Sequence, residues 1–368
     1  MSNANENQGL AKVMDTLLLG GASIIVWMVF RLIELDKKEI LILALGMMFL
    51  ANFVNHPHFV HSYQMFFEIW PEIKLDKKSA RYKARWLVTA IFIPLFLAVC
   101  LAFSVYFSIH GDFRPMQVCL GTYAVLVGWH YVKQSFGMAL FDAARSKVYW
   151  SAYSRKVLLW NSYISWIAAL MISASVFAGG EFWGVKFPTL GLFDGYWTAA
   201  AAAVAAISAA WTLFVLWRQI QSWRKSGIVI LKMPLAGMIG YLIGIYLWTL
   251  LAWLDYKFIL VIPFFHSLQY LVIVSKYQKG RNKINLGVSR ILSADVLNYA
   301  RAIIIGAVAF WVVPGLLDYL DGRGVNFLSS GVFIFTAAIW IFINIHHYFI
   351  DSVIWKKENP LMEKYLFS

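Results

Sequence analysis

The chain has 368 residues, of which 61% are hydrophobic and 14% charged, and its mean hydropathy is +0.66. A soluble domain is usually about half apolar and a quarter charged, so this composition excludes an ordinary soluble enzyme, a disordered chain and a small disulfide scaffold. The net charge of +13 does not indicate nucleic-acid binding, because most Lys and Arg residues lie in short segments between apolar runs. The sequence predicts an integral membrane protein.

About ten apolar runs are long enough to cross a bilayer core, which takes about 20 helical residues. In chain order they cover residues 16–30, 40–61, 86–107, 118–138, 157–178, 197–217, 235–254, 258–275, 302–318 and 331–350. No internal repeat or long linker divides the chain. We therefore predict an all-α, polytopic membrane helical bundle of about ten transmembrane helices that forms one domain over residues 1–368.

The 32 Lys and Arg residues are unevenly divided between the two ends of these runs. The termini and the segments after the second, fourth, sixth and eighth runs carry 24 of them, the opposite side carries seven, and Lys133 lies inside a run. Segments rich in Lys and Arg stay on the cytoplasmic side of a membrane. Both termini are therefore predicted to be cytoplasmic, and we expect the membrane to be the inner membrane of a bacterium.

Seven of the eight histidines fall on four predicted helices, most of them in the cytoplasmic half of the helix. They are His56, His58, His61, His130, His266, His346 and His347, whereas His110 lies in a loop predicted to face outward. A polar side chain in the hydrocarbon layer is costly unless a partner or a water-lined cavity receives it. The recurrence of imidazoles at one depth predicts a shared metal site near the cytoplasmic side.

The spacing around the first group adds detail. His58 and His61 are three residues apart and share a helix face. Pro57 lacks a backbone donor and can bend the chain, which would turn His56 inward as well.

The other three groups each have a polar neighbour one helical turn away. Gln134 follows His130, Gln269 follows His266, and Asp351 shares a face with His347. We predict that Gln134, Gln269 and Asp351 take part in catalysis by orienting the imidazoles, and Asp351 is also a candidate metal ligand.

The donor set narrows the choice of metal. Imidazoles with little carboxylate and no thiolate suit iron, zinc or copper and disfavour magnesium and calcium. A pair of b-type haems held by opposed histidines is an alternative, although three histidines within six residues fit a polyhistidine site better. Transport of a metal ion is a further alternative, but the helices carry few of the Asp and Glu residues that ion pathways commonly use.

The four histidine stretches resemble, in order and spacing, the Brp/Blh family of membrane proteins that cleave beta-carotene to retinal. The resemblance rests on Pro57-His58, His130-Tyr131, His266-Ser267 and the segment from His346 to Asp351. Phe59, Tyr131-Val132 and Tyr270 depart from the residues of that family at the corresponding places. The resemblance implies a non-haem iron centre that activates dioxygen, held by His58, His130, His266 and His346, and it does not carry over carotene as the substrate.

The membrane alkane hydroxylases and fatty-acid desaturases are similar in kind, since they also hold iron with histidines at the cytoplasmic ends of membrane helices. Their HxxxH and HxxHH boxes do not occur in this sequence. We rank this second resemblance lower.

These observations together predict a membrane metal-dependent oxygenase that cleaves, hydroxylates or desaturates a lipophilic substrate. Its cofactor would be one or two non-haem irons, with dioxygen as co-substrate, and an electron-donor protein and membrane lipids are possible partners. The preferred ligands are His58, His61, His130, His266 and His347, followed by His56 and His346. The alternative from another class is a non-catalytic haem- or quinone-binding electron carrier, or a metal-ion permease.

Overall fold

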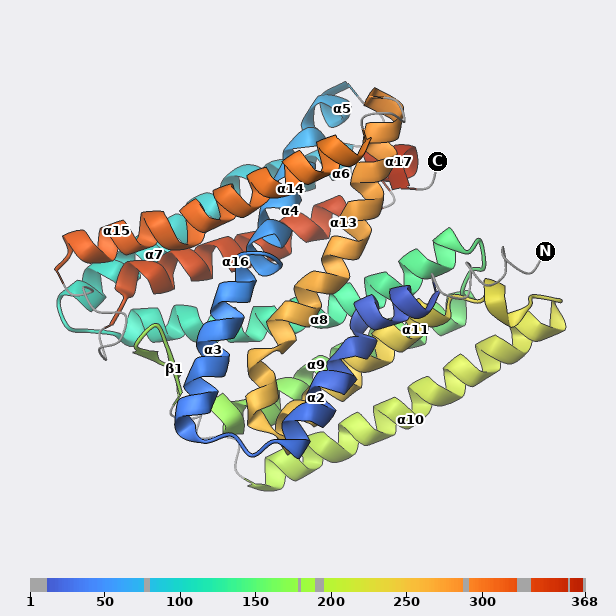
Figure 1. The fold of residues 1–368 in the computed structure, drawn as a ribbon, viewed down its shortest axis with the longest axis horizontal. Helices are drawn as coiled ribbons and strands as arrows, with labels where there is room; N and C mark the ends of the chain where they lie inside the picture. Colours follow the sequence, from blue (N-terminus) through green and yellow to red (C-terminus); the bar gives the residue numbers. More distant parts are fainter. Residues whose placement is uncertain are drawn as a thin grey trace. The chain divides into compact units, whose positions relative to one another are not determined.

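The computed structural model describes residues 12–75, 80–177, 180–188, 195–286, 291–322, 332–356 and 358–366 (Figure 1). Within these ranges the chain is almost entirely helical. The strands among the described residues are β1 (Glu181–Phe182) and β2 (Val185–Lys186), which pair antiparallel as a short hairpin. The predicted all-α fold is confirmed.

Nine helical stretches of the described residues are long and apolar enough to cross a membrane. They are Lys12–Leu32, Lys38–Lys74, Ala80–Ile109, Ala152–Ser173, Gly195–Lys225, Leu235–Leu254, Tyr256–Asn285, Ala294–Leu320 and Ile334–Ile354. The chain is therefore a polytopic membrane protein. The predicted run 118–138 lies in helix α8 (Arg114–Arg145), which carries His130, Lys133 and Gln134 near its middle and is not among the nine.

The chain divides into two compact units, each assembled from three separate stretches. Unit 1 comprises Met1–Leu50, Gly128–Val176 and Leu190–Val272, and unit 2 comprises Ala51–Val127, Phe177–Thr189 and Ile273–Ser368. The boundaries fall within helices α3, α8, α9 and α13, so that both units contain parts of the same helices. The prediction of one domain over residues 1–368 stays a prediction.

Unit 1 holds the N-terminal and central helices. They are the π-helical turn η1 (Leu17–Gly21), α2 (Ala22–Leu32), most of α3 (Lys37–Ala51), the second part of α8, α9 (Ala152–Phe177), α10 (Gly195–Lys225), the turn η3 (Ile230–Lys232), α11 (Leu235–Leu242), the π-helical turn η4 (Ile243–Leu247), α12 (Trp248–Leu254), the turn η5 (Tyr256–Leu260) and the first part of α13 (Ile262–Leu286).

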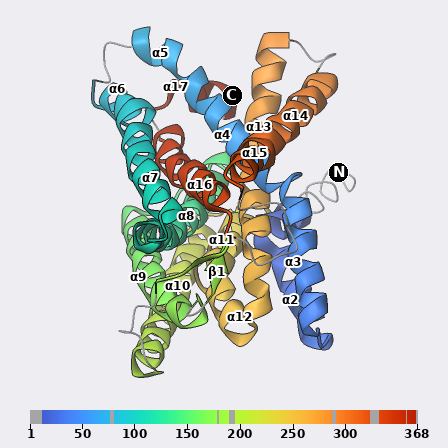
Figure 2. The same ribbon diagram turned by 90° about the vertical axis from the view of Figure 1, so that its left-hand side faces the viewer.

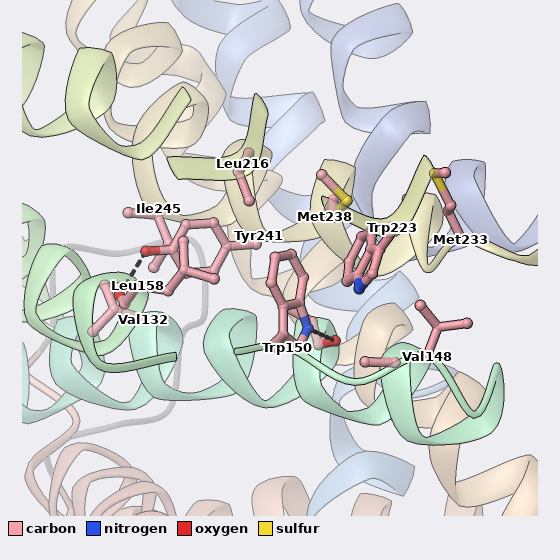
Figure 3. Close-up of a cluster of buried hydrophobic side chains, with 12 residues drawn as sticks. Val132, Val148, Trp150, Leu158, Leu216, Trp223, Met233, Met238, Tyr241 and Ile245 are labelled. Atoms are coloured by element: carbon pink, nitrogen blue, oxygen red, sulfur yellow. Dashed lines mark hydrogen bonds between the residues drawn. The ribbon is translucent and has the colours of Figure 1, made fainter. Parts of the chain in front are cut away.

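A cluster of large apolar side chains fills part of unit 1 (Figure 3). Trp150, Trp223 and Tyr241 lie at its centre, where Tyr241 of α11 meets Leu158 of α9. The Tyr241 hydroxyl donates a hydrogen bond to the Leu158 carbonyl at 2.7 Å, and the Trp150 indole donates to the Ala139 carbonyl at 3.1 Å. The polar atoms of these aromatic residues are thus satisfied inside an apolar core.

Unit 2 holds the remaining elements. They are α4 (Asn55–Glu68), α5 (Trp70–Leu75), α6 (Ala80–Leu87), the π-helical turn η2 (Val88–Phe92), α7 (Ile93–Ile109), the first part of α8, the β1–β2 hairpin, the last part of α13, α14 (Ile291–Ala307), the π-helical turn η7 (Val308–Val312), α15 (Val313–Leu320), α16 (Ile334–Ile354) and α17 (Pro360–Leu366). Helix α16 packs against both α4 and α7, and α4 packs against α14. Figures 1 and 2 show α7 and α16 side by side.

Candidate metal centre

Helix α4 starts where the sequence predicts a bend. Helix α3 ends at Ala51 and α4 begins at Asn55, which places Pro57 in the first helical turn, where a missing backbone donor is tolerated. Proline at this position leaves the Phe53 carbonyl without a helical donor, and the Tyr299 hydroxyl from α14 donates to it instead. His56, His58 and His61 are all buried, as the predicted bend implied for His56.

Helix α16 supplies the second set of site residues. Its N-terminus is capped by the buried Asp318 of α15, whose carboxylate accepts hydrogen bonds from the backbone amides of Phe335 and Thr336, both at 2.9 Å. The helix then runs through His347 and Asp351, which are four residues apart and therefore share a face. Because α16 packs against α4, this face meets the histidines of α4.

His58, His347 and Asp351 form the candidate metal centre of unit 2. One ligand atom of each lies within 4.8 Å of those of the other two. The Nε2 atom of His347 is 3.4 Å from Oδ2 of Asp351, and the His58 and His347 rings meet edge to face with centroids 4.5 Å apart. The three residues are 1%, 0% and 8% exposed, so two imidazoles and a carboxylate converge in a site closed to solvent.

The distance between His347 and Asp351 fits two ligands of one metal ion. Two ligands that are each about 2.1 Å from one metal ion lie about 3.0–3.4 Å apart at octahedral or tetrahedral angles. The separation of 3.4 Å between the His347 nitrogen and the Asp351 oxygen is within that range.

Phe59 holds the two imidazoles of this centre in place. Its ring is nearly parallel to that of His58, at an angle of 14° and 5.0 Å between centroids. It is nearly perpendicular to the His347 ring, at 79° and 4.8 Å. Phe59 is itself buried and gives the centre an apolar wall.

His61 lies one turn beyond His58. Its Nδ1 is 2.9 Å from both the Gln64 amide oxygen and the Gln278 amide nitrogen, and the tautomer decides which of the two it bonds. Nε2 of His61 has no hydrogen-bond partner in the described part of the chain. When Nδ1–H donates to Gln64, Nε2 therefore presents a lone pair.

His56 occupies an aromatic pocket next to the centre. Its ring stacks on Phe310 at 4.3 Å and 2°, and meets Trp340 edge to face at 5.6 Å. Neither ring nitrogen has a hydrogen-bond partner among the residues the structure describes. A Cβ atom at Gly306 would lie 2.6 Å from Cβ of His56, so glycine at position 306 allows α14 to approach α4 this closely.

His346 has both ring nitrogens engaged. The Tyr63 hydroxyl and Nδ1 are 2.8 Å apart, and Nε2 is 2.9 Å from the Thr89 carbonyl. A carbonyl can only accept, so Nε2–H donates to Thr89 and Nδ1 accepts from Tyr63. This arrangement leaves no nitrogen of His346 for a metal, and we omit His346 from the ligand set proposed below.

The remaining two histidines belong to unit 1. His130 on α8 and His266 on α13 are both 3% exposed, and their rings meet edge to face with centroids 4.9 Å apart. Tyr131 stacks on His266 at 3.9 Å and 21°. Unit 1 thus brings together the second and third histidine stretches of the sequence.

The two predicted orienting glutamines bind backbone carbonyls. Gln134 Nε2 donates to the carbonyl of His266 at 2.8 Å, and Gln269 Nε2 donates to the carbonyl of Leu19 at 2.6 Å. Gln134 also contacts the amide oxygen of Gln269 at 3.3 Å. These bonds fix the backbone around His266 and do not involve its imidazole.

Several residues that shape the site were not predicted. Gln64 follows His61 by three residues and was open to prediction from spacing. Tyr63 and Thr89 are 283 and 257 residues away from His346, and no local pattern links them to it.

Comparison of the chain with known protein families, with curated proteins and with solved structures finds no match.

Proposed function

We propose that this chain is a membrane non-haem iron oxygenase that acts on a lipophilic substrate, with iron held by His58, His347 and Asp351. The observation that carries the proposal is the convergence of two buried imidazoles and one buried carboxylate, with ligand atoms within 4.8 Å of one another. Two histidines and one carboxylate, with further coordination positions open, are the donor set of many non-haem Fe(II) oxygenases. Iron bound there supplies the electrons that spin-paired organic molecules do not readily give to dioxygen.

The protein residues have distinct tasks in this proposal. Asp351 supplies a negative charge that offsets part of the charge of the ion, which matters in a site that solvent does not reach. Phe59 fixes the two rings and keeps water from the coordination positions that dioxygen and substrate need. His61 is the next ligand candidate, since Gln64 can hold its Nδ1–H and leave Nε2 to bind metal.

The ring geometry favours a metal ion over haem. A haem held by two histidines lies between their imidazoles. The His58 and His347 centroids are 4.5 Å apart and those of His130 and His266 are 4.9 Å apart, which leaves no room for a macrocycle within either pair.

The other parts of the sequence prediction are kept as proposals. Participation of His130 and His266 in the same centre joins residues of both units and stays a prediction. An electron-donor protein is kept as a possible partner, and residence in a bacterial inner membrane is kept as a proposal beside the orientation that the distribution of basic residues predicts.

Dioxygen uptake by detergent-purified, Fe(II)-loaded protein tests the proposal. With carotenoid, fatty-acyl and alkane substrates supplied in turn, at least one should stimulate uptake and yield an oxidised product. His347→Ala should abolish this activity, and Asp351→Asn, which removes the negative charge of the third ligand, should reduce it strongly. His110→Ala is the matched control, because His110 is exposed and its ring bonds to the local Tyr106 carbonyl.

Two outcomes would contradict the proposal. One is full uptake and product formation by His347→Ala. The other is iron-loaded wild-type protein that consumes no dioxygen with any of the substrates; transport of the metal into proteoliposomes would then favour a permease.

A further inference from the structure

We propose that a chain of aromatic side chains in unit 2 relays single electrons between the candidate metal centre and the β1–β2 hairpin. The aromatic chain consists of Phe59, Phe310, Trp340, Trp311 and Trp183. The inference rests on the proposed function, since it needs a metal that changes oxidation state at His58 and His347.

The rings of the aromatic chain contact one another without a gap. From the His347 ring the centroids step 4.8 Å to Phe59, 5.2 Å to Phe310 and 5.1 Å to Trp340. Trp340 is 5.4 Å from Trp183 and 5.7 Å from Trp311, and Trp183 is 5.8 Å from Trp311. Separations of this size are those of packed aromatic pairs, so electrons can pass through ring contacts along the whole route.

The order of residue types suits stepwise transfer. Of the two ring types in the aromatic chain, indole is easily oxidised, whereas the phenyl ring is very hard to oxidise. Trp340, Trp311 and Trp183 can therefore each hold a hole, that is, a missing electron. Phe59 and Phe310 serve as the medium through which Trp340 gives its electron to the metal centre.

The hydrogen bonds of the two inner indoles keep a hole mobile. An oxidised indole becomes a strong acid at its N–H, and loss of that proton to a base traps the hole as a neutral radical. The Trp340 N–H donates to the Phe310 carbonyl at 3.0 Å, and the Trp311 N–H donates to the Asn52 amide oxygen at 2.8 Å. Amide oxygens are very weak bases, so both indoles keep their protons and can be reduced again.

Trp183 is placed to exchange electrons with the outside. It sits in the turn of the hairpin, is partly exposed, and its carbonyl accepts a hydrogen bond at 3.0 Å from Phe333, next to the start of α16. Its φ is +53°, a conformation that bulky residues rarely adopt. The hairpin thus holds a strained tryptophan against Trp340 and Trp311, at a position where Gly, Asn or Asp would satisfy the turn more easily.

Each transfer is balanced. When hydrogen peroxide, itself reduced to water, has oxidised the metal centre by two electrons and no organic substrate is present, Trp340 gives the centre one electron and becomes a radical cation. Trp183 then gives one electron to Trp340, and a thiol or ascorbate-type reductant in solution gives one electron to Trp183. The net result is a centre reduced by one electron and a donor oxidised by one electron, with His58, His347 and Phe59 left intact.

Rapid-freeze electron paramagnetic resonance tests the relay. Fe(II)-loaded protein, grown with deuterated tryptophan so that indole radicals are identified by narrowed lines, is mixed with hydrogen peroxide without organic substrate. Wild-type protein should show a tryptophan radical. Trp340→Phe should lose this signal and gain oxidative modification of the peptides that contain His58 and His347, measured by mass spectrometry.

The controls separate the relay from the metal site. When ascorbate is added with the peroxide, Trp183→Phe should lengthen the lifetime of the radical, since the route from the reductant is removed, and this variant tests the relay even where Trp340→Phe does not fold. Trp217→Phe, on the exposed face of α10, should behave as wild type. Iron-loaded wild-type protein without a tryptophan radical, or an unchanged signal in Trp340→Phe or Trp183→Phe, overturns the relay and leaves the metal centre standing. Failure of the wild-type protein to bind iron overturns the proposed function and the relay with it.

Discussion

Each of three prolines in unit 2 leaves a backbone carbonyl without its helical hydrogen-bond donor, and a side chain from another helix donates to that carbonyl. Pro57 cannot donate to the Phe53 carbonyl, which accepts from Tyr299. Pro314 stands four residues after Phe310, whose carbonyl accepts from the Trp340 indole at 3.0 Å.

The third case fixes His346. Pro94 stands five residues after Thr89 and cannot make the π-type bond that the turn η2 would call for, and the Thr89 carbonyl accepts from His346 at 2.9 Å. Single residues that cannot donate thus determine where Tyr299, Trp340 and His346 are anchored.

His346 is expected to stabilise the fold without binding metal. His346→Leu should leave a buried carbonyl and a buried hydroxyl without their partner, which lowers the free energy of unfolding by about 1–3 kcal/mol. Tyr63→Phe removes one of the two bonds and should lower it by about 1 kcal/mol. Thermal denaturation and metal analysis of both variants check this, and His346→Leu protein with normal stability but no metal would instead identify His346 as a ligand.

The sequence predicted only those parts of the site that depend on interactions between residues close together in the chain. The pairing of His347 with Asp351 and the inward turn of His56 follow from helical periodicity and from Pro57, which act within one or two turns. The partners of His346 and of Gln269 come from distant helices, and the carbonyls they bind are released by π-helical turns that hydrophobic patterns do not reveal. Local spacing therefore placed the glutamines near the rings but could not show that they bind backbone.

At the scale of elements, hydropathy located nine of the membrane helices because each is a long apolar run. It did not predict the β1–β2 hairpin, which has only four paired residues, nor the start of α14 at Ile291, well before the predicted run 302–318. The structure also divides the stretch Lys38–Lys74 into α3, α4 and α5, of which only the break before Pro57 was readable from sequence.

The contact of α4 with α14 should be sensitive to one methyl group. In Gly306→Ala the new Cβ would lie 2.6 Å from Cβ of His56 and 3.3 Å from its backbone carbonyl carbon, so one helix must shift. Overpacking of this kind costs about 1–3 kcal/mol. We expect a lower thermal midpoint and reduced metal occupancy, because the shift moves the turn of α4 that carries His58.

Gly315→Ala is the matched control for that prediction. Gly315 lies on the neighbouring helix α15, and a Cβ atom there would meet nothing within 4 Å. Equal losses of stability in Gly306→Ala and Gly315→Ala would show that the close approach at His56 is not the cause.

At the scale of the whole molecule, the crossing of α8 decides the topology. If α8 crosses the membrane in addition to the nine apolar stretches, the chain crosses ten times and both termini lie on one side. If it does not, the termini lie on opposite sides. Three helices separate His110 from Ser226, namely α8, α9 and α10.

Labelling of single cysteines at these two positions distinguishes the topologies. In a background with Cys100 and Cys119 replaced by alanine, a membrane-impermeant thiol reagent should label Ser226→Cys only from the cytoplasmic side and His110→Cys only from the opposite side. Labelling of both from the same side would mean that α8 does not cross. Ser79, a second predicted cytoplasmic position, lies outside the described residues.

The most direct test of the metal centre is the metal content of detergent-purified protein, measured by mass spectrometry after iron loading and removal of free metal. We predict at least one iron per wild-type chain, none in His58→Ala or His347→Ala, and full occupancy in His110→Ala. The variants His130→Ala and His266→Ala test the sequence prediction that unit 1 contributes to the same centre. If it does, both variants should lose iron. Wild-type occupancy in folded His58→Ala and His347→Ala protein would contradict the assignment of iron to His58, His347 and Asp351.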